Sequence, residues 1–299
     1  MTMTTRLLVF VLVAALAMPG RAEAWGFAGH HLIMERAIAL LPAELRPLFE
    51  KHRAKVVERI IDPDTWRAAG FAEEEPNHFL DLDWEGFGKE PFTGLPRDYT
   101  AAVAKFGRAR IQDNGVVPWR TEEMFGNLRR AFQDYGRRGA FGQVDIIHFS
   151  AWLSHYVSDA IQPFHGVINY DGQLTKQNGV HARFETALVE RYMNELALTP
   201  SPLPPIRAPR DFIFERLIED TRLAPGILKA DLDAIATRDV YDDAYFDAFF
   251  RATRPVLERR LSESIAAVAA MITGAWEAAG RPPVPVSPAP PPPRRRARP

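Results

Sequence analysis

The chain has 299 residues, of which 46% are hydrophobic and 25% are charged, and this composition is sufficient for one large core or two small ones. Its 37 Lys and Arg nearly balance its 38 Asp and Glu, so net charge argues neither for nor against a nucleic-acid partner. The chain contains no cysteine. Disulfides, thiolate zinc sites and cysteine nucleophiles are therefore excluded, and any metal must be held by nitrogen and oxygen.

The N-terminal segment has the order of a secretory signal peptide. Arg6 precedes an apolar run over residues 7–18, and the small-residue triplet Ala-Glu-Ala follows at 22–24. A basic residue, an apolar run and such a triplet are typical of a cleaved export signal, and the run is shorter than the roughly 20 residues of a membrane span. We expect residues 1–24 to be removed between Ala24 and Trp25, which gives a secreted or periplasmic protein.

After residue 24, apolar residues recur at spacings of three and four, as in helices that bury one face. The pattern is found at 30–41, 45–61, 121–135, 144–161, 182–196 and 241–279. Strand signals are few, so the sequence predicts an all-α, multi-helix single domain over residues 25–280. Stretches at 70–99 and 199–210 contain several prolines and are expected to be loops.

The C-terminal segment 281–299 is dominated by proline and ends in a cluster of arginines. Such a composition cannot bury a core and predicts a disordered tail. Its basic end could contact an anionic surface such as lipid or cell wall, although a solvated extension without a partner is the more common case. No feature of the chain indicates an obligate protein partner.

Three histidines and two acids carry the strongest chemical pattern. His155 and Asp159 are four residues apart in a predicted helix and so project from one face. A proline at 163 should end or kink this helix and turn His165 back toward the same region, while His181 and Glu185 repeat the four-residue spacing. One such pair is more often a simple ion pair, but the combination offers the nitrogen and oxygen ligands that zinc accepts.

In order and spacing, the chain resembles the bacterial zinc-dependent phospholipases C and the fungal zinc nucleases that cut single-stranded nucleic acid. Their motifs run Trp, His, Asp, His, then His-x3-Asp-x5-His, then His-x3-Asp or Glu. The chain supplies Trp25, His30, Asp64, His78, His155-x3-Asp159-x5-His165 and His181-x3-Glu185. The resemblance covers residues 25–185 and implies a domain of that superfamily with three zinc ions.

The resemblance also implies how the ligands are shared. One zinc would be held by Asp64, His78, His155 and Asp159, a second by His165, His181 and Glu185, and a third by Trp25, His30 and Asp159. Cleavage before Trp25 would free its α-amino group, which can bind a metal as an internal amide cannot. Asp62 competes with Asp64 for one role, and the Pro63-Asp64 pair of the phospholipases favours Asp64.

The implied reaction is phosphoester hydrolysis by a metal-activated hydroxide, without a covalent intermediate. Asp64 is the candidate catalytic residue, and whether it orients or deprotonates the nucleophile besides binding metal stays open. His148, two turns before His155, is a candidate partner for a ligand carboxylate, whereas His31 and His52 are expected to be solvated.

The substrate is a phosphoester, either a phospholipid or a nucleic acid or nucleotide. The spacing of Trp25 and His30 resembles the nucleases, whereas the Pro63-Asp64 pair and Glu185 resemble the phospholipases, which we prefer. Possible aromatic cages for a choline head group come from Trp66, Phe71 and Trp84, each as readily assigned to the core. The alternatives are a single-strand nuclease or 3′-nucleotidase and, in another class, a non-catalytic exported zinc-binding protein.

Overall fold

Every regular element of the protein between residues 25 and 286 is a helix. The computed structural model describes these residues, and it contains no strand within them. The all-α prediction is therefore confirmed. The predicted signal peptide at 1–24 and residues 287–299 of the predicted tail lie outside the described residues.

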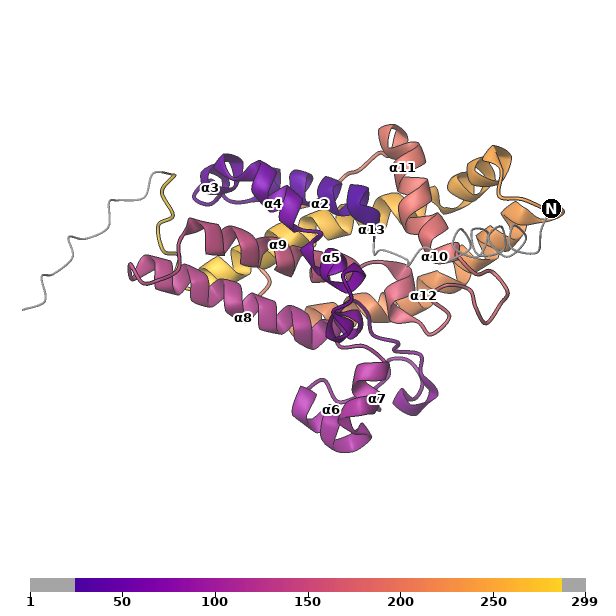
Figure 1. The fold of residues 1–299 in the computed structure, drawn as a ribbon, viewed down its shortest axis with the longest axis horizontal. Helices are drawn as coiled ribbons and strands as arrows, with labels where there is room; N and C mark the ends of the chain where they lie inside the picture. Colours follow the sequence, from indigo (N-terminus) through magenta and orange to yellow (C-terminus); the bar gives the residue numbers. More distant parts are fainter. Residues whose placement is uncertain (1–24, 287–299) are drawn as a thin grey trace, which may run out of the picture.

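Four long helices run along the long axis of the molecule and form its body (Figure 1). They are α8 (Val117–Gly136), α9 (Gln143–Asp159), α12 (Pro209–Ile235) and α13 (Asp243–Ala278). Helix α9 packs against α8 and α13 and also against the helices that precede α8 in the chain. Its second half is therefore buried almost all round, including Ser154, His155, Ser158 and Asp159. Polar side chains in such a position need partners, because burying them without any is costly.

Four shorter helices lead from residue 26 to the candidate site. They are α2 (Gly26–Leu40), α3 (Arg46–Lys51), α4 (Arg53–Arg59) and α5 (Asp62–Ala68), with α2 packed on α13 and α4 packed on α9. The prediction of one continuous helix over 45–61 is wrong, because the backbone leaves helical geometry at His52. Helix α5 has Pro63 in its first turn, where the missing N–H costs nothing.

Residues 83–113 form a lobe that protrudes from the bundle (Figure 1). It contains η2 (Glu85–Phe87), α6 (Tyr99–Phe106) and α7 (Arg108–Asp113), and η1 (Ala72–Asn77) precedes it. Trp84, Phe87 and Phe106 meet edge to face inside the lobe, with ring centroids 4.9–5.7 Å apart. The predicted loop at 70–99 thus contains short helices and an aromatic core of its own.

The helix predicted over 182–196 is present as a series of short pieces. They are α10 (Val180–Ala182), the π-helix η4 (Arg183–Ala187), α11 (Leu188–Tyr192) and η5 (Met193–Glu195). The single turn η3 (Pro163–Gly166) follows α9. Helix α12 is a 27-residue helix that the sequence analysis did not assign.

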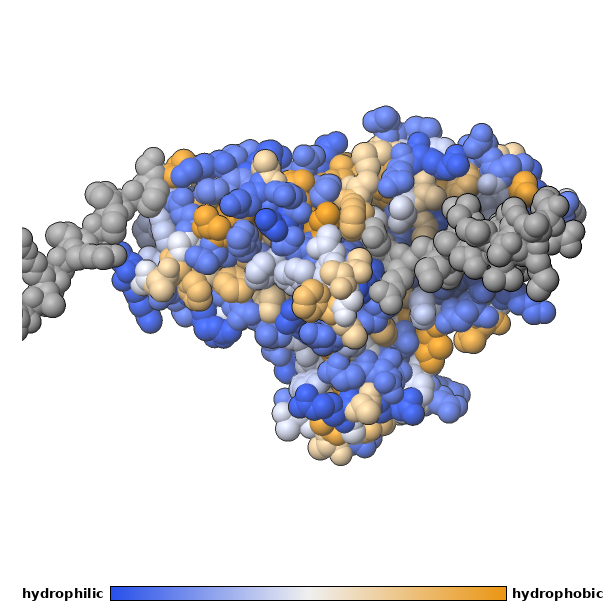
Figure 2. All heavy atoms as spheres, in the orientation of Figure 1, coloured by the Kyte–Doolittle hydropathy of each residue, from blue (hydrophilic) through white to orange (hydrophobic). Residues whose placement is uncertain are grey.

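The described chain ends against the body of the protein. Val284 is buried, and Lys51 Nζ donates to the carbonyl of Val286 at 2.5 Å, so part of the segment 281–286 contacts the helices although it was assigned to the tail. The face in Figure 2 is mostly hydrophilic with scattered apolar residues. Between residues 25 and 286, no helix combines the length and apolar character needed to cross a bilayer.

Candidate metal centre

Eight histidine and acidic side chains from separate segments meet in the interior beside α9. All eight are buried. They are His30 on α2, Asp64 on α5, His78 after η1, His155 and Asp159 on α9, His165 in η3, His181 in α10 and Glu185 in η4. The structure thus brings together every side chain that the sequence analysis selected as a metal ligand.

Asp159 lies at the centre of the first part of this site. Its Oδ1 is 3.3 Å from His30 Nε2, and its Oδ2 is 2.9 Å from His78 Nδ1 and 3.2 Å from His155 Nε2. The two oxygens of one carboxylate therefore face different imidazoles. This is the geometry that a bridging carboxylate between two metal ions would need.

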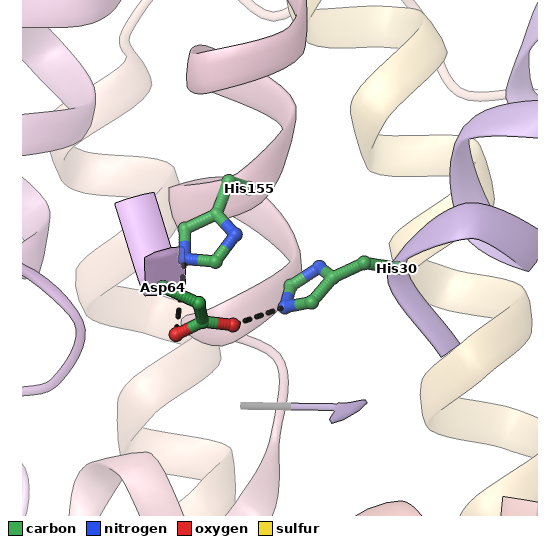
Figure 3. Close-up of side chains that lie close together, drawn as sticks. All are labelled: His30, Asp64 and His155. Atoms are coloured by element: carbon green, nitrogen blue, oxygen red, sulfur yellow. Dashed lines mark ion pairs between the residues drawn. The ribbon is translucent and has the colours of Figure 1, made fainter. Parts of the chain in front are cut away.

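Asp64 approaches the same imidazoles from α5. Its Oδ2 is 3.8 Å from His30 Nε2, and its Oδ1 is 3.9 Å from His155 Nε2 (Figure 3). The guanidinium of Arg67 contacts Oδ1 at 3.1 Å. Asp62, which the sequence offered as an alternative to Asp64, takes no part in these contacts. Its carboxylate accepts a hydrogen bond from the indole of Trp152 at 2.9 Å.

The second part of the site is built around Glu185. His181 Nε2 is 2.8 Å from Glu185 Oε2 and 3.2 Å from His165 Nε2. The backbone N of Trp25 donates to the same carboxylate oxygen at 3.0 Å, and so does the amide of Gln162 at 2.6 Å. The backbone nitrogen of Trp25 therefore lies beside Glu185. The family resemblance instead implies that Trp25 and Glu185 bind different zinc ions.

Local sequence explains how α9 and the following turn present their ligands. His155 and Asp159 are one helical turn apart, so both face inward. The helix ends at Asp159, and Gln162 caps the next turn by accepting from the backbone N–H of Phe164. Because Pro163 can occupy the first turn of η3 but not the interior of α9, the chain reverses and returns His165 to the site.

Hydrogen bonds behind the rings fix which nitrogen points inward. His165 Nδ1 lies 2.7 Å from the carbonyl of His78, and His30 Nδ1 lies 3.0 Å from the hydroxyl of Ser158. The backbone N–H of Leu80 also donates to the carbonyl of His165 at 2.9 Å. With Nδ1–H engaged behind the ring, Nε2 of each histidine presents its lone pair to the site, as in known metal centres.

Burial sets the protonation of the histidines. Burial lowers the pKa of His30, His165 and His181 to about 4 and that of His78 to about 3. The cause is that an imidazolium is poorly solvated in the interior. His155 is the exception: burial opposes its charge, but Asp159 and Asp64 raise its pKa above the ordinary value. Four of the rings are therefore neutral at pH 7, the form that binds a metal.

Burial acts in the opposite direction on two of the carboxyls. It raises the pKa of Asp64 to about 7 and that of Glu185 to about 8. At Asp159 burial is outweighed by His155 and by hydrogen bonds from the surrounding imidazoles, so its pKa lies well below the ordinary value. A cation placed among these groups would favour the ionised form of all three.

The unpaired atoms of the site support a fit for metal ions. His30 Nε2, Asp64 Oδ2, Asp159 Oδ1 and Glu185 Oε1 are buried without a hydrogen-bond partner, which is rare for buried polar atoms. Ligand atoms about 2.0–2.1 Å from a tetrahedral zinc are roughly 3.3 Å from one another. The 3.1 Å separation of His155 Nε2 and His78 Nδ1 is close to that value.

Three groups of side chains bring their ligand atoms within 4.8 Å of one another. They are His30, Asp64 and His155, then His78, His155 and Asp159, then His165, His181 and Glu185. These groups could hold metal ions, and their nitrogen and oxygen donors suit zinc.

A pocket of about 670 Å³ opens beside these groups. Three of the site histidines form part of its wall, together with Arg67 and with the aromatic rings of Phe79, Phe164 and Tyr170; the histidines are His78, His165 and His181. These aromatic residues were not predicted from the sequence. Phe79 directly follows His78 and Phe164 directly precedes His165, and this adjacency to motif histidines was the available signal.

The other aromatic residues and the histidine weighed in the sequence lie outside the pocket wall. Trp66 meets Trp152 edge to face at 5.2 Å, and His148 stacks on the same indole at 5.8 Å. Trp84 packs in the protruding lobe, and Phe71 is 55% exposed. None of the three aromatic residues suggested for a choline cage, Trp66, Phe71 and Trp84, is part of the pocket wall.

No protein-family model matches the chain, and no curated protein matches it. The resemblance to zinc phospholipases C and zinc nucleases therefore depends on the motif residues.

Proposed function

We propose that the chain is an exported zinc-dependent phosphoesterase of the phospholipase C type. The observation that carries the proposal is that three of the candidate ligands border a pocket. His78, His165 and His181 belong both to the metal-binding groups and to the wall of that pocket. A storage or structural site needs closed coordination, whereas a catalytic site needs room for water and substrate.

Zinc bound here would supply a Lewis acid and lower the pKa of water at the site. The role of the protein is to hold the ligands neutral or anionic as required. Asp159 offers one oxygen to His30 and the other to His78 and His155, so it is the proposed bridge. The buried histidines stay unprotonated at neutral pH because burial lowers their pKa.

Asp64 is the proposed catalytic residue. Arg67 engages its Oδ1, whereas its Oδ2 is buried without a hydrogen-bond partner. Burial raises its pKa to about 7 in the metal-free protein, and a bound cation would lower that value, so Asp64 would be ionised at neutral pH, as a proton acceptor must be. We propose that Asp64 orients or deprotonates that water in addition to binding metal.

The charges around the pocket favour a lipid over a nucleic-acid strand. Its wall includes four acidic residues and one arginine; the acids are Glu75, Asp81, Asp113 and Asp171. Proteins that bind nucleic acid neutralise successive phosphates with Lys and Arg, which this wall does not provide. A substrate with a single phosphodiester beside a neutral or cationic group fits the wall better.

The test is a panel of phosphodiesters given to purified protein that begins at Trp25. Phospholipid in mixed micelles, single-stranded DNA and RNA, and a small chromogenic diester are each assayed with zinc and with chelator. We expect chelator-sensitive turnover of the lipid and of the chromogenic diester. Preferential cleavage of DNA or RNA would favour the nuclease alternative, and no chelator-sensitive turnover would favour a non-catalytic zinc binder.

Two neighbouring aspartates provide a matched control for this assay. Asp64→Asn removes a carboxylate whose Oδ2 is unpartnered in the site, while Asp62→Asn changes a carboxylate that pairs with Arg59 and Trp152. The proposal requires that Asp64→Asn abolish turnover and that Asp62→Asn retain it. Equal activity of the two variants would remove Asp64 from the catalytic role.

A further inference from the structure

Helix α9 contains three buried serines at intervals of one turn, Ser150, Ser154 and Ser158, and the last two differ in one contact. The hydroxyl of Ser154 donates to the carbonyl of Ser150 at 2.6 Å, and the hydroxyl of Ser158 donates to the carbonyl of Ser154 at 2.8 Å. Such bonds are the usual way for a serine to be satisfied inside a helix. The hydroxyl of Ser158 in addition lies 3.0 Å from His30 Nδ1.

The single proton of the Ser158 hydroxyl determines the direction of this contact. Two backbone carbonyls of α9 lie within hydrogen-bond distance of this hydroxyl, that of Ser154 at 2.8 Å and that of His155 at 2.9 Å, so we assign the proton to a bond with one of them. The oxygen then has only lone pairs left for His30, so Nδ1 of His30 must carry the hydrogen. Nε2 is left with its lone pair, and this atom is 3.3 Å from Asp159 Oδ1.

Ser158 makes a second contact with the start of the domain. Its backbone carbonyl accepts a hydrogen bond from the indole Nε1 of Trp25 at 2.7 Å. Trp25 and His30 are the two candidate ligands that precede all others in the chain, and one residue of α9 touches both. Ser158 occupies a position that the spacing of His155 and Asp159 leaves unspecified, so the motif does not explain it.

We infer that Ser158 is a positioning residue, which holds His30 in the tautomer that binds metal through Nε2 and seats Trp25 beside the site. The inference rests on the proposed metal site. It concerns the part of the site that includes His30, because Glu185 and His165 have other partners, the amide of Gln162 and the carbonyl of His78. Outer partners of metal-ligating histidines typically contribute about 10–100-fold in metal affinity.

The test compares wild type, Ser158→Ala and Ser154→Ala, all beginning at Trp25. Each variant loses one buried hydroxyl and one bond to a helix carbonyl, but the backbone contact to Trp25 stays. Metal stoichiometry is measured after dialysis against buffered zinc, and Co²⁺ binding is followed by visible absorption. We expect Ser154→Ala to bind as wild type does and Ser158→Ala to lose or weaken one ion by about 10-fold or more.

Thermal unfolding in chelator separates this effect from misfolding, and the two alanine variants should lose similar stability. A second measurement needs no variant: in metal-free wild type, ¹⁵N spectra of the imidazole should show His30 protonated at Nδ1. Equal metal binding by the two variants, or a proton on Nε2 of His30, would overturn the inference and leave the metal site standing. A wild type that binds no metal would overturn both.

Discussion

Two buried clusters of charged side chains in this protein differ in how their negative charge is compensated. One surrounds Arg260 of α13, and the other is the candidate metal centre beside α9. Both contain fully buried carboxylates, which are unfavourable in a core unless they are compensated. The difference lies in where the compensating positive charge comes from.

The cluster at Arg260 contains its own cation. The guanidinium donates to Glu219 and Glu263 at 2.9 and 2.7 Å, to Asp220, and to the carbonyl of Ile161 at 2.8 Å. Each of its nitrogens therefore has an oxygen acceptor. This cluster joins α12 and α13 to the turn after α9, and it needs no ligand.

The candidate metal centre has carboxylates and mostly neutral imidazoles in place of a guanidinium. Asp64 contacts Arg67, and one oxygen each of Asp64, Asp159 and Glu185 is buried without a partner, as is Oδ2 of Asp220 in the other cluster; only in the candidate metal centre do such atoms converge with histidine nitrogens. The comparison shows that burial of acids does not by itself indicate a metal site. What indicates one is a set of convergent donor atoms whose compensating charge the surrounding residues do not supply.

The largest expected effect comes from the central carboxylate. Because each oxygen of Asp159 faces different imidazoles, Asp159→Asn should abolish zinc binding by the groups at His30 and His78 and eliminate phosphodiester turnover. Asp220→Asn changes an equally buried aspartate at Arg260 and should leave the zinc content unchanged. Zinc content is read by atomic absorption, and full occupancy in Asp159→Asn would contradict the comparison.

The reverse experiment removes the internal cation. Arg260→Met leaves Asp220 and the carbonyl of Ile161 without their donor, and loss of one partner of a buried pair typically costs about 3–5 kcal/mol. Urea unfolding in chelator should show that loss, while the folded fraction still binds zinc as wild type does. A variant as stable as wild type would mean that the Arg260 cluster is not needed to hold the helices together.

Trp25, the proposed first residue of the exported protein, distinguishes the two clusters further, since of the two only the candidate metal centre lies beside it. One alanine added before Trp25 turns the backbone nitrogen near Glu185 into an amide. We expect zinc affinity to fall by at least the roughly 10-fold that loss of an outer partner causes, and activity to fall with it. Removal of the alanine by an aminopeptidase should restore both, and undiminished metal content in the extended protein would reject Trp25 as a ligand.

The smallest effect is the pH dependence of the metal-free protein. Burial holds the pKa of His30, His165 and His181 at about 4 and that of His78 at about 3, so the unfolded chain binds protons that the folded rings do not as pH falls from 6.5 to 4. The free energy of unfolding should fall over that range.

Above pH 6.5 the carboxyls of the candidate metal centre dominate. Burial raises the pKa of Asp64 to about 7 and that of Glu185 to about 8, so the stability that their protonated forms contribute is lost as pH rises through these values. Thermal unfolding in chelator should therefore show a maximum near pH 6.5. Saturating zinc should remove the loss above pH 7, and an unchanged profile would contradict the idea that zinc binds to these carboxylates.

Local patterns in the chain were enough to predict the helical class and the candidate side chains from His155 to Glu185, whereas the other candidate ligands came from the family resemblance. The four-residue spacing of His155 and Asp159 depends only on helix geometry, which is local. Helix α12 was nevertheless missed, although its buried residues Ile213, Phe214, Leu217 and Ile218 follow the helical spacing. The preceding prolines at 200–209 and the internal Pro225 obscured that signal.

Other features depend on contacts between segments far apart in the chain. The hydrogen bonds from Trp25 to Ser158 and Glu185 join residues more than 130 positions apart. The pocket wall likewise combines the segment after η1 with the loop before α10. Periodicity reports which face of a helix is buried, but not which distant side chain it meets. Residue types and spacings thus identified the chemistry, while the packing of the whole bundle decided which donor atoms converge, because those distances are set only when every helix is in place.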